Sequence, residues 1–385
     1  MKQVSHFIGL SGIGGVQRNF VEYLADIESN HSQFKHRVYT MGKVDGEYRI
    51  TIDILNIKKL RNLCLLIKDL ISKKTIVHFY NNLSSTKVAF LLFFIPVCKL
   101  IIHERGTAWN QSVKKGLITR FNARKASVIL SNSKATKTIL VKKFLIPEDK
   151  ITVIYNGVDI DKCVIQNKLK LGNDTFKLGF LGRLDSPKGV HVLIEAMQYL
   201  KEYKVKLFIA GDGPLFDVLK EQSKNYTNIV FIGRVKDPYD FLKQIDLLVV
   251  PSIREPFGNI CIEAGLCKTP VLASNIDGIP EIIKHNFSGE LITPTDNLTI
   301  RSAHNMAPIP EYVVNPQTQG LQVPMQLNSF KLANKIIELS KDVKRLNRYS
   351  LELHNIIISK FSIGRYSSNL ELIYRELHNC KKPDN

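Results

Sequence analysis

Short runs of β-branched and aromatic residues alternate with longer segments of helical periodicity along most of the chain. This alternation predicts parallel α/β folding, in which a helix returns the chain from the end of one strand to the start of the next. The expected strands form two series, each long enough for a sheet with its own core, so the pattern predicts two doubly wound, Rossmann-like domains. The first series is 3–9, 76–80, 99–103, 127–131 and 151–155; the second is 176–182, 206–210, 229–233, 247–251, 270–273 and 290–293, followed by helical periodicity at 331–339 and 365–378.

A polar, lysine-rich stretch without clear periodicity separates the two series at 161–175. We therefore expect an N-terminal domain at 1–160 and a C-terminal domain at 161–360, with a helix in 361–385 packing back on the N-terminal domain. The strand ends of the two domains would face each other across a cleft, where open α/β sheets bind ligands. The stretch 294–329 carries five prolines and weak periodicity, which indicates an insertion, such as a lid, or a divergent segment.

The composition of the 385 residues, 44% hydrophobic and 23% charged, excludes a disordered, collagenous or fibrous protein. The net charge of +19 indicates anionic partners, and most of it lies in the first 160 residues, where 25 Lys and Arg stand against 11 Asp and Glu. Six scattered cysteines lack Cys-x-x-Cys or zinc-type spacing, so we expect reduced thiols in a cytoplasmic protein rather than disulfides or a metal knuckle.

Ten basic residues and no acidic one occur between Glu104 and Glu148. With Leu117, Ile118 and Phe121 among them, this run could lie on an anionic membrane, although a solvated helix face explains it equally well. The apolar run 88–102 is shorter than the roughly 18 residues that span a bilayer. We therefore expect no transmembrane helix, but a buried or interface-lying segment. The N-terminal stretch MKQVSHFIGLSG falls short of a secretory apolar region, so we also expect no signal peptide.

The strongest chemical signal is SIREPFGNICIEAGLCKTPVLASNIDGIPEII, which follows the strand ending at Pro251. It places Glu255 and Glu263 on either side of a turn that opens a helix, where the main-chain N–H groups of 257–259 favour a phosphate or sugar. A carboxylate one turn into the helix suits the vicinal hydroxyls of a sugar or ribose. Eight helical positions span about 12 Å, which disfavours the closer carboxylate pair of a glycoside hydrolase.

Weaker signals occur at three other strand ends. In GFLGRLDSPKG, Arg183 and Lys188 are suited to clamping a diphosphate. The glycines of LSGIGGVQRNF permit a close approach to phosphate, but the segment fails the dinucleotide fingerprint and no P-loop occurs, which disfavours NAD enzymes and P-loop kinases. His103 is the best acid–base candidate, although a structural role is more common, and Asp159 and Asp161 are interpreted as turn residues rather than metal ligands.

These motifs resemble retaining glycosyltransferases of family 4, which have the two-domain GT-B fold. The resemblance rests on YNGVD, GRLDSPKG, GDGP and FIGRV and on the pair Glu255 and Glu263, with a weaker N-terminal match at Gly14-Gly15 and His103. It departs from the family pattern in the long 294–329 stretch, at Lys268, where glycine is usual, and at Asp277, which replaces the first residue of the usual Gly-Gly pair.

The resemblance implies a metal-independent hexosyltransferase that uses a UDP- or GDP-sugar as co-substrate and no cofactor. Arg183 and Lys188 would hold the diphosphate, Glu255 would contact the donor sugar and Glu263 the ribose, with His103 as a further catalytic candidate. The donor-binding residues would be Gly15, Gly182, Arg183, Lys188, Val235, Glu255, Phe257, Gly258, Asn259 and Glu263.

The implied acceptor is a glycan or undecaprenyl-linked oligosaccharide of a bacterial O-antigen, lipopolysaccharide core or capsule, which places the protein at the inner face of the cytoplasmic membrane. A nucleotide-sugar epimerase or hydrolase of the same fold is an alternative. A nucleic-acid-binding protein is suggested only by the charge and lacks interleaved aromatic and basic residues, so we expect no nucleic acid.

Overall fold

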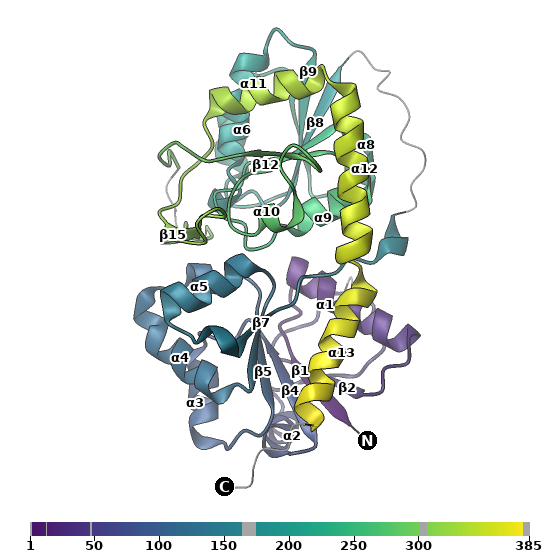
Figure 1. Ribbon diagram of the computed structural model, residues 1–385, viewed down its shortest axis with the longest axis vertical. Coiled ribbons are helices and arrows are strands. Elements are labelled where there is room, and N and C mark those ends of the chain that lie inside the picture. Colours follow the sequence, from purple (N-terminus) through teal and green to yellow (C-terminus); the bar gives the residue numbers. More distant parts are fainter. Residues whose placement is uncertain (1, 13, 47, 164–174, 301–305, 380–385) are drawn as a thin grey trace. The chain divides into compact units, whose positions relative to one another are not determined.

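The computed structural model describes residues 2–12, 14–46, 48–163, 175–300 and 306–379 (Figure 1). The chain divides into two compact units. Unit 1 comprises Met1–Asp159 and Phe361–Asn385, and unit 2 comprises Ile160–Lys360. Each unit has its own parallel sheet, which confirms the expected α/β class with two doubly wound domains.

The sheet of unit 1 has the strand order β3-β2-β1-β4-β5-β6-β7, and all its pairings are parallel. Its central strands β4 and β5 are buried along their whole length, as expected of parallel strands covered on both faces. The strands are β1 (Gln3–Phe7), β2 (Lys35–Thr40), β3 (Ile54–Asn56), β4 (Thr75–Tyr80), β5 (Leu100–Glu104), β6 (Val128–Ser131) and β7 (Ile151–Val153). The helices are α1 (Gly15–Ser29), α2 (Leu60–Ile71), α3 (Thr86–Phe94), α4 (Gly116–Lys125), α5 (Lys134–Phe144) and α13 (Ile363–Asn379).

Helix α13 belongs to unit 1 although it follows all of unit 2 and is the last helix among the described residues. It lies beside α1 over the sheet (Figure 1). Tyr366, Leu370 and Tyr374 enter the same core cluster as Phe20 and Ile76. Their spacing of four residues places them on one apolar face of the helix, which is why this segment packs on the sheet.

The sheet of unit 2 has the order β10-β9-β8-β11-β12-β13, again all parallel. Its main core lies between the sheet and the helices α6 and α11. The strands are β8 (Phe176–Leu181), β9 (Val205–Ala210), β10 (Ile229–Gly233), β11 (Leu247–Val250), β12 (Val271–Ser274) and β13 (Glu290–Ile292), with a separate antiparallel pair, β14 (Val313–Val314) and β15 (Leu321–Gln322). The helices are α6 (Val190–Ala196), α7 (Phe216–Gln222), α8 (Pro238–Gln244), α9 (Asn259–Leu266), α10 (Ile279–Ile282), α11 (Ser329–Ser340) and α12 (Val343–Lys360).

Most of the expected linker lies outside the described residues, at 164–174. Of the stretch 294–329, the residues 301–305 are also outside them; the rest forms the β14–β15 pair and a bridge between Asp296 and Gln326. Strands β2 and β3 and helix α12 are absent from the sequence-based series. No described helix is both long and apolar enough to cross a bilayer.

Candidate functional site

The loop that follows β8 carries the first two expected cations. It leaves the sheet at Gly182 and forms a short 3-10 helix, η5 (Ser186–Lys188). Asp185 caps this helix by accepting the N–H of Ser186 at 2.9 Å, and the same carboxylate lies 2.9 Å from Nε of Arg183. The ion pair is formed by Nε, so Nη1 and Nη2 of the guanidinium take no part in it. The Arg183 side chain is 61% exposed.

Gly189 brings this loop against the loop that follows β11. Its φ is +67°, and a Cβ here would lie 2.0 Å from the carbonyl oxygen of Pro251, so only glycine fits. As a result, Nζ of Lys188 lies 2.6 Å from Oε2 of Glu255, and the hydroxyl of Ser252 donates to the same oxygen at 3.3 Å. The structure thus joins two of the expected site residues, and the Glu255 residue is only 8% exposed.

The turn that follows β12 fixes the backbone of Glu255. Asp277 Oδ2 accepts the Glu255 N–H at 2.9 Å, and the Glu255 carbonyl accepts the N–H of Gly278 at 3.1 Å. Asp277 Oδ1 accepts the N–H of Val314 at 2.7 Å, while the Asp277 N–H donates to the Val314 carbonyl at 3.1 Å. The Asp277 carboxylate therefore accepts two hydrogen bonds that the family's usual glycine could not accept. At φ +46°, however, Asp277 occupies the left-handed region that favours glycine.

Helix α9 begins where the sequence places it. Gly258 is its N-cap residue at φ +106° and has no side chain with which to cap the helix. Main-chain N–H groups and the helix dipole at such a terminus favour an anion, and Phe257 immediately before it is buried. Glu263 lies in the second turn and is partly exposed, and Val235 follows the end of β10 by two residues. All these residues lie at or beyond the carboxyl ends of the strands of unit 2 or on the helix that follows.

Arg254 is a third cation at this edge, and sequence reasoning did not single it out. Burial lowers its pKa, while the charges of Glu255, Asp277 and Asp185 act in the opposite direction, in that order. The main-chain N–H of Arg254 donates to the carbonyl of Pro187 at 3.2 Å. The one available signal was its position directly before Glu255.

The described part of the proline-containing stretch contacts the same loops. The N–H of Ala307 donates to Asp185 Oδ1 at 2.9 Å, and the Ser186 hydroxyl lies 3.4 Å from Sδ of Met306. Together with the contact from Val314 to Asp277, these bonds attach residues 306–314 to two of the three loops. The segment forms part of this edge.

Two expected site residues, Gly15 and His103, lie in unit 1. Gly15 is exposed and is the first residue of α1. His103 is fully buried at the end of β5, and its ring stacks on that of His78 with centroids 5.5 Å apart. Burial and then the charge of Arg105 hold the pKa of His103 well below its ordinary value, so the ring is neutral near pH 7. An acid–base role for His103 stays a prediction.

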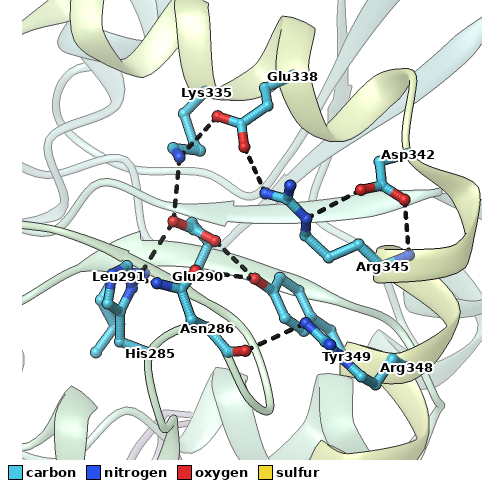
Figure 2. Close-up of polar contacts among 10 residues, drawn as sticks. All are labelled: His285, Asn286, Glu290, Leu291, Lys335, Glu338, Asp342, Arg345, Arg348 and Tyr349. Carbon is cyan, nitrogen blue, oxygen red and sulfur yellow. Dashed lines mark hydrogen bonds and ion pairs between the residues drawn. The ribbon is translucent and has the colours of Figure 1, made fainter.

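A pocket of about 890 Å³ opens elsewhere in unit 2, at β13, α11 and α12, and none of the expected site residues lines it. Figure 2 shows its polar network. The buried Glu290 carboxylate lies 3.3 Å from Nζ of Lys335 and accepts the hydroxyl of Tyr349 at 2.8 Å. Lys335 and Arg345 both pair with Glu338. These charges neutralise one another, so we interpret the network as a clamp that holds α11 and α12 to β13.

Within the described residues, no group of three or more His, Cys, Asp or Glu side chains is arranged to hold a metal ion. Asp159 is the last residue of the first segment of unit 1, and Asp161 lies in the short 3-10 helix η4 (Ile160–Lys162) of unit 2.

Two parallel α/β units in this order match the GT-B fold of solved glycosyltransferase structures. Anabaena Alr3699/HepE in complex with UDP and glucose matches with a TM-score of 0.75 at 20% identity, over 98% of this chain and 100% of that one. Residues 33–162 match the family model described as Glycosyltransferase Family 4, and residues 161–302 match Glycosyl transferases group 1. Both halves of the chain therefore carry glycosyltransferase family-model domains.

Two curated relatives match parts of the chain. The chain is 32% identical over 187 residues to the capsular polysaccharide biosynthesis glycosyltransferase CapM of Staphylococcus aureus, covering 44% of this chain and 49% of the relative. It is 28% identical over 265 residues to the UDP-Gal:alpha-D-GlcNAc-diphosphoundecaprenol alpha-1,3-galactosyltransferase of Escherichia coli, covering 62% and 68%. The chain spans about half the length of several curated relatives that it matches.

Proposed function

We propose that this chain is a retaining hexosyltransferase that moves a sugar from a UDP- or GDP-sugar to a glycan or undecaprenyl-linked acceptor. The observation that carries the proposal is the joining of Lys188 to Glu255 beside Arg183, at the edge of a parallel sheet where α/β proteins bind ligands. The relatives that act in capsule synthesis and on an undecaprenyl-linked substrate support the acceptor class.

In the proposed reaction, negative charge develops on the departing diphosphate. Arg183 and Lys188 are proposed to bind it, because a planar fork and a point charge placed in advance lower the barrier for charge separation. When the diphosphate binds, Lys188 would exchange part of its contact with Glu255 for phosphate oxygens, which would release Glu255 to accept hydroxyl groups of the sugar. Since these cations supply the stabilising charge, we propose that no divalent metal is needed.

The remaining contacts follow from position. Gly182, Val235 and the main chain of 257–259 are proposed to line the donor site, with Glu263 accepting the ribose hydroxyls. Gly15 and His103 are proposed to act from unit 1.

Retention of the anomeric configuration is proposed to follow front-face attack with the leaving phosphate as base, so no protein nucleophile is assigned. We further propose that the protein works in the cytoplasm at the inner face of the membrane, in O-antigen, lipopolysaccharide core or capsule synthesis.

The test is a thermal-shift screen against UDP, GDP and ADP and their sugars, with and without a chelator. A ligand that binds only the folded state raises the unfolding midpoint by mass action. A shift with one nucleotide class that survives chelator and is lost in Arg183→Ala supports the proposal. Donor incubated alone then separates the alternatives, because an epimerase or hydrolase converts it without an acceptor. No shift with any nucleotide would overturn the assignment of the donor site.

A further inference from the structure

Three phenylalanines project from one helix of unit 1 into solvent. Phe90, Phe93 and Phe94 of α3 are 70%, 67% and 66% exposed. The opposite side of the helix is already used, since Val88 and Leu92 are buried against the rest of the unit. A surface helix normally presents polar residues on its outer face, so an aromatic outer face indicates a further binding partner.

The aromatic surface continues onto the neighbouring helix. Phe93 contacts the ring of Phe121 of α4, with centroids 6.4 Å apart, and α3 packs against α4. Leu117 at the start of α4 is 74% exposed, and Val113 in the short 3-10 helix η2 (Val113–Lys115) is 48% exposed. We call the exposed surface of α3, η2 and α4 the aromatic–basic face.

The charge on this face has one sign. Exposed lysines and arginines accompany the apolar side chains, and Nζ of Lys125 lies 5.6 Å from the centre of the Phe121 ring. The exposed cations are Lys87, Lys114, Lys115, Arg124 and Lys125, and Arg120 is partly exposed. Between Asp69 and Glu148 the one carboxylate is that of Glu104, which is fully buried. No carboxylate from α3, η2 or α4 therefore opposes the positive charge.

We propose that the aromatic–basic face binds the surface of an anionic phospholipid bilayer, with the three phenylalanines inserted at the boundary between headgroups and acyl chains. Exposed aromatic rings partition into that boundary, and lysines and arginines beside them bind the lipid phosphates. A second copy of the chain is disfavoured as occupant, because two faces of the same positive charge repel each other. The proposed function places the protein at the membrane surface without naming the residues in contact with lipid, and this inference names them. Lipid binding by the aromatic–basic face can be measured without assuming the transferase activity.

The test is flotation of the purified chain with vesicles of phosphatidylcholine alone and of phosphatidylcholine with phosphatidylglycerol. We expect salt-sensitive binding to the anionic vesicles only. The triple variant Phe90→Gln, Phe93→Gln and Phe94→Gln is expected to bind at least tenfold more weakly with an unchanged unfolding midpoint. Phe330→Gln, at a phenylalanine of unit 2 that is 52% exposed, is the matched control and is expected to bind like the wild type.

A second measurement locates the contact. The single native tryptophan, Trp109, is buried, so Phe94→Trp adds a tryptophan whose emission reports on residue 94. Its emission is expected to shift to the blue and to be quenched by brominated lipid in the anionic vesicles. Unaltered flotation of the triple variant, or no flotation of the wild type, overturns the proposal. Nucleotide thermal shifts on the same samples keep the two proposals apart, because loss of donor binding leaves flotation unchanged.

Discussion

Nζ of Lys188 lies 2.6 Å from Oε2 of Glu255, and the two residues come from loops at the ends of neighbouring strands, β8 and β11. Without a ligand, each side chain neutralises the other in a partly buried position. In the proposed donor complex the diphosphate would offer Lys188 a stronger anion, so donor binding and the freeing of Glu255 would be one event. This coupling makes the pair the first target for mutation.

Lys188→Ala is expected to reduce kcat by about 10²- to 10³-fold, the usual cost of removing a group that stabilises developing charge. The KM for the donor should rise as well, because ground-state contacts to the diphosphate are lost. Steady-state kinetics with varied donor measures both. Lys224→Ala, at an exposed lysine of the same unit, is the control, and an equal loss in that variant would contradict the assigned role.

Asp277→Gly would restore the residue usual in the family and relieve the left-handed backbone. It would also delete the acceptors for the N–H groups of Glu255 and Val314. We expect unfolding free energy to fall by about 1.5–3 kcal/mol, the value of hydrogen bonds to a charged group, and kcat to fall more than the donor affinity. Lys268→Gly is the matched control, because Lys268 also has a positive φ, of +52°, and also replaces a family glycine. Chemical denaturation should show little change there, and equal losses in both variants would contradict the positioning role of the Asp277 carboxylate.

Stability is expected to fall as the pH drops below about 6.5. Burial holds the pKa of His6, His78 and His103 well below 6.5 and lowers that of His36 to about 4. Because these folded-state values lie below the unfolded one, the unfolded chain binds more protons between pH 6.5 and 4. The cost is at most about 1.4 kcal/mol per histidine for each pH unit, and it vanishes above the unfolded pKa. Urea unfolding at a series of pH values measures it, and His103→Gln should reduce the slope by about one proton.

Tyr349→Phe tests the clamp at the separate pocket. It removes the hydroxyl that donates to the buried Glu290 carboxylate, and we expect a loss of about 1–3 kcal/mol in unfolding free energy. Burial followed by this hydrogen bond raises the pKa of Tyr349 to about 12, so the loss should be constant through neutral pH. Nucleotide thermal shifts should keep their size. A variant that stays as stable as the wild type but loses nucleotide binding would contradict the structural interpretation of this pocket.

The sequence predicts the central strands well because each is a dense run of buried apolar residues. Strand β2, in contrast, begins with the polar residues Lys35, His36 and Arg37, and β3 has only three residues, so neither produces a clear pattern. Helix α12 buries Ser350 and His354 among its apolar positions, which weakens its periodicity. Periodicity reports apolar faces and misses elements whose buried face is partly polar.

The same limit applies to the site. Arg183, Lys188 and Glu255 can be singled out as candidates from the sequence, because charged residues in strand-end loops are conspicuous. The roles of Asp185 and Asp277 are carried by hydrogen bonds to backbone groups of Ala307 and Val314, which come from far along the chain. Such contacts depend on tertiary structure and leave no local signal.

The return of α13 to unit 1 sets the order in which the protein can be completed. Tyr366, Leu370 and Tyr374 fill the core beside α1 and β4, and the ribosome makes them only after all of unit 2. During synthesis, unit 1 therefore has an uncovered apolar surface for as long as unit 2 is being synthesised. A nascent chain released before residue 363 would leave that surface exposed, so the folding of unit 1 depends on a helix that is synthesised after unit 2.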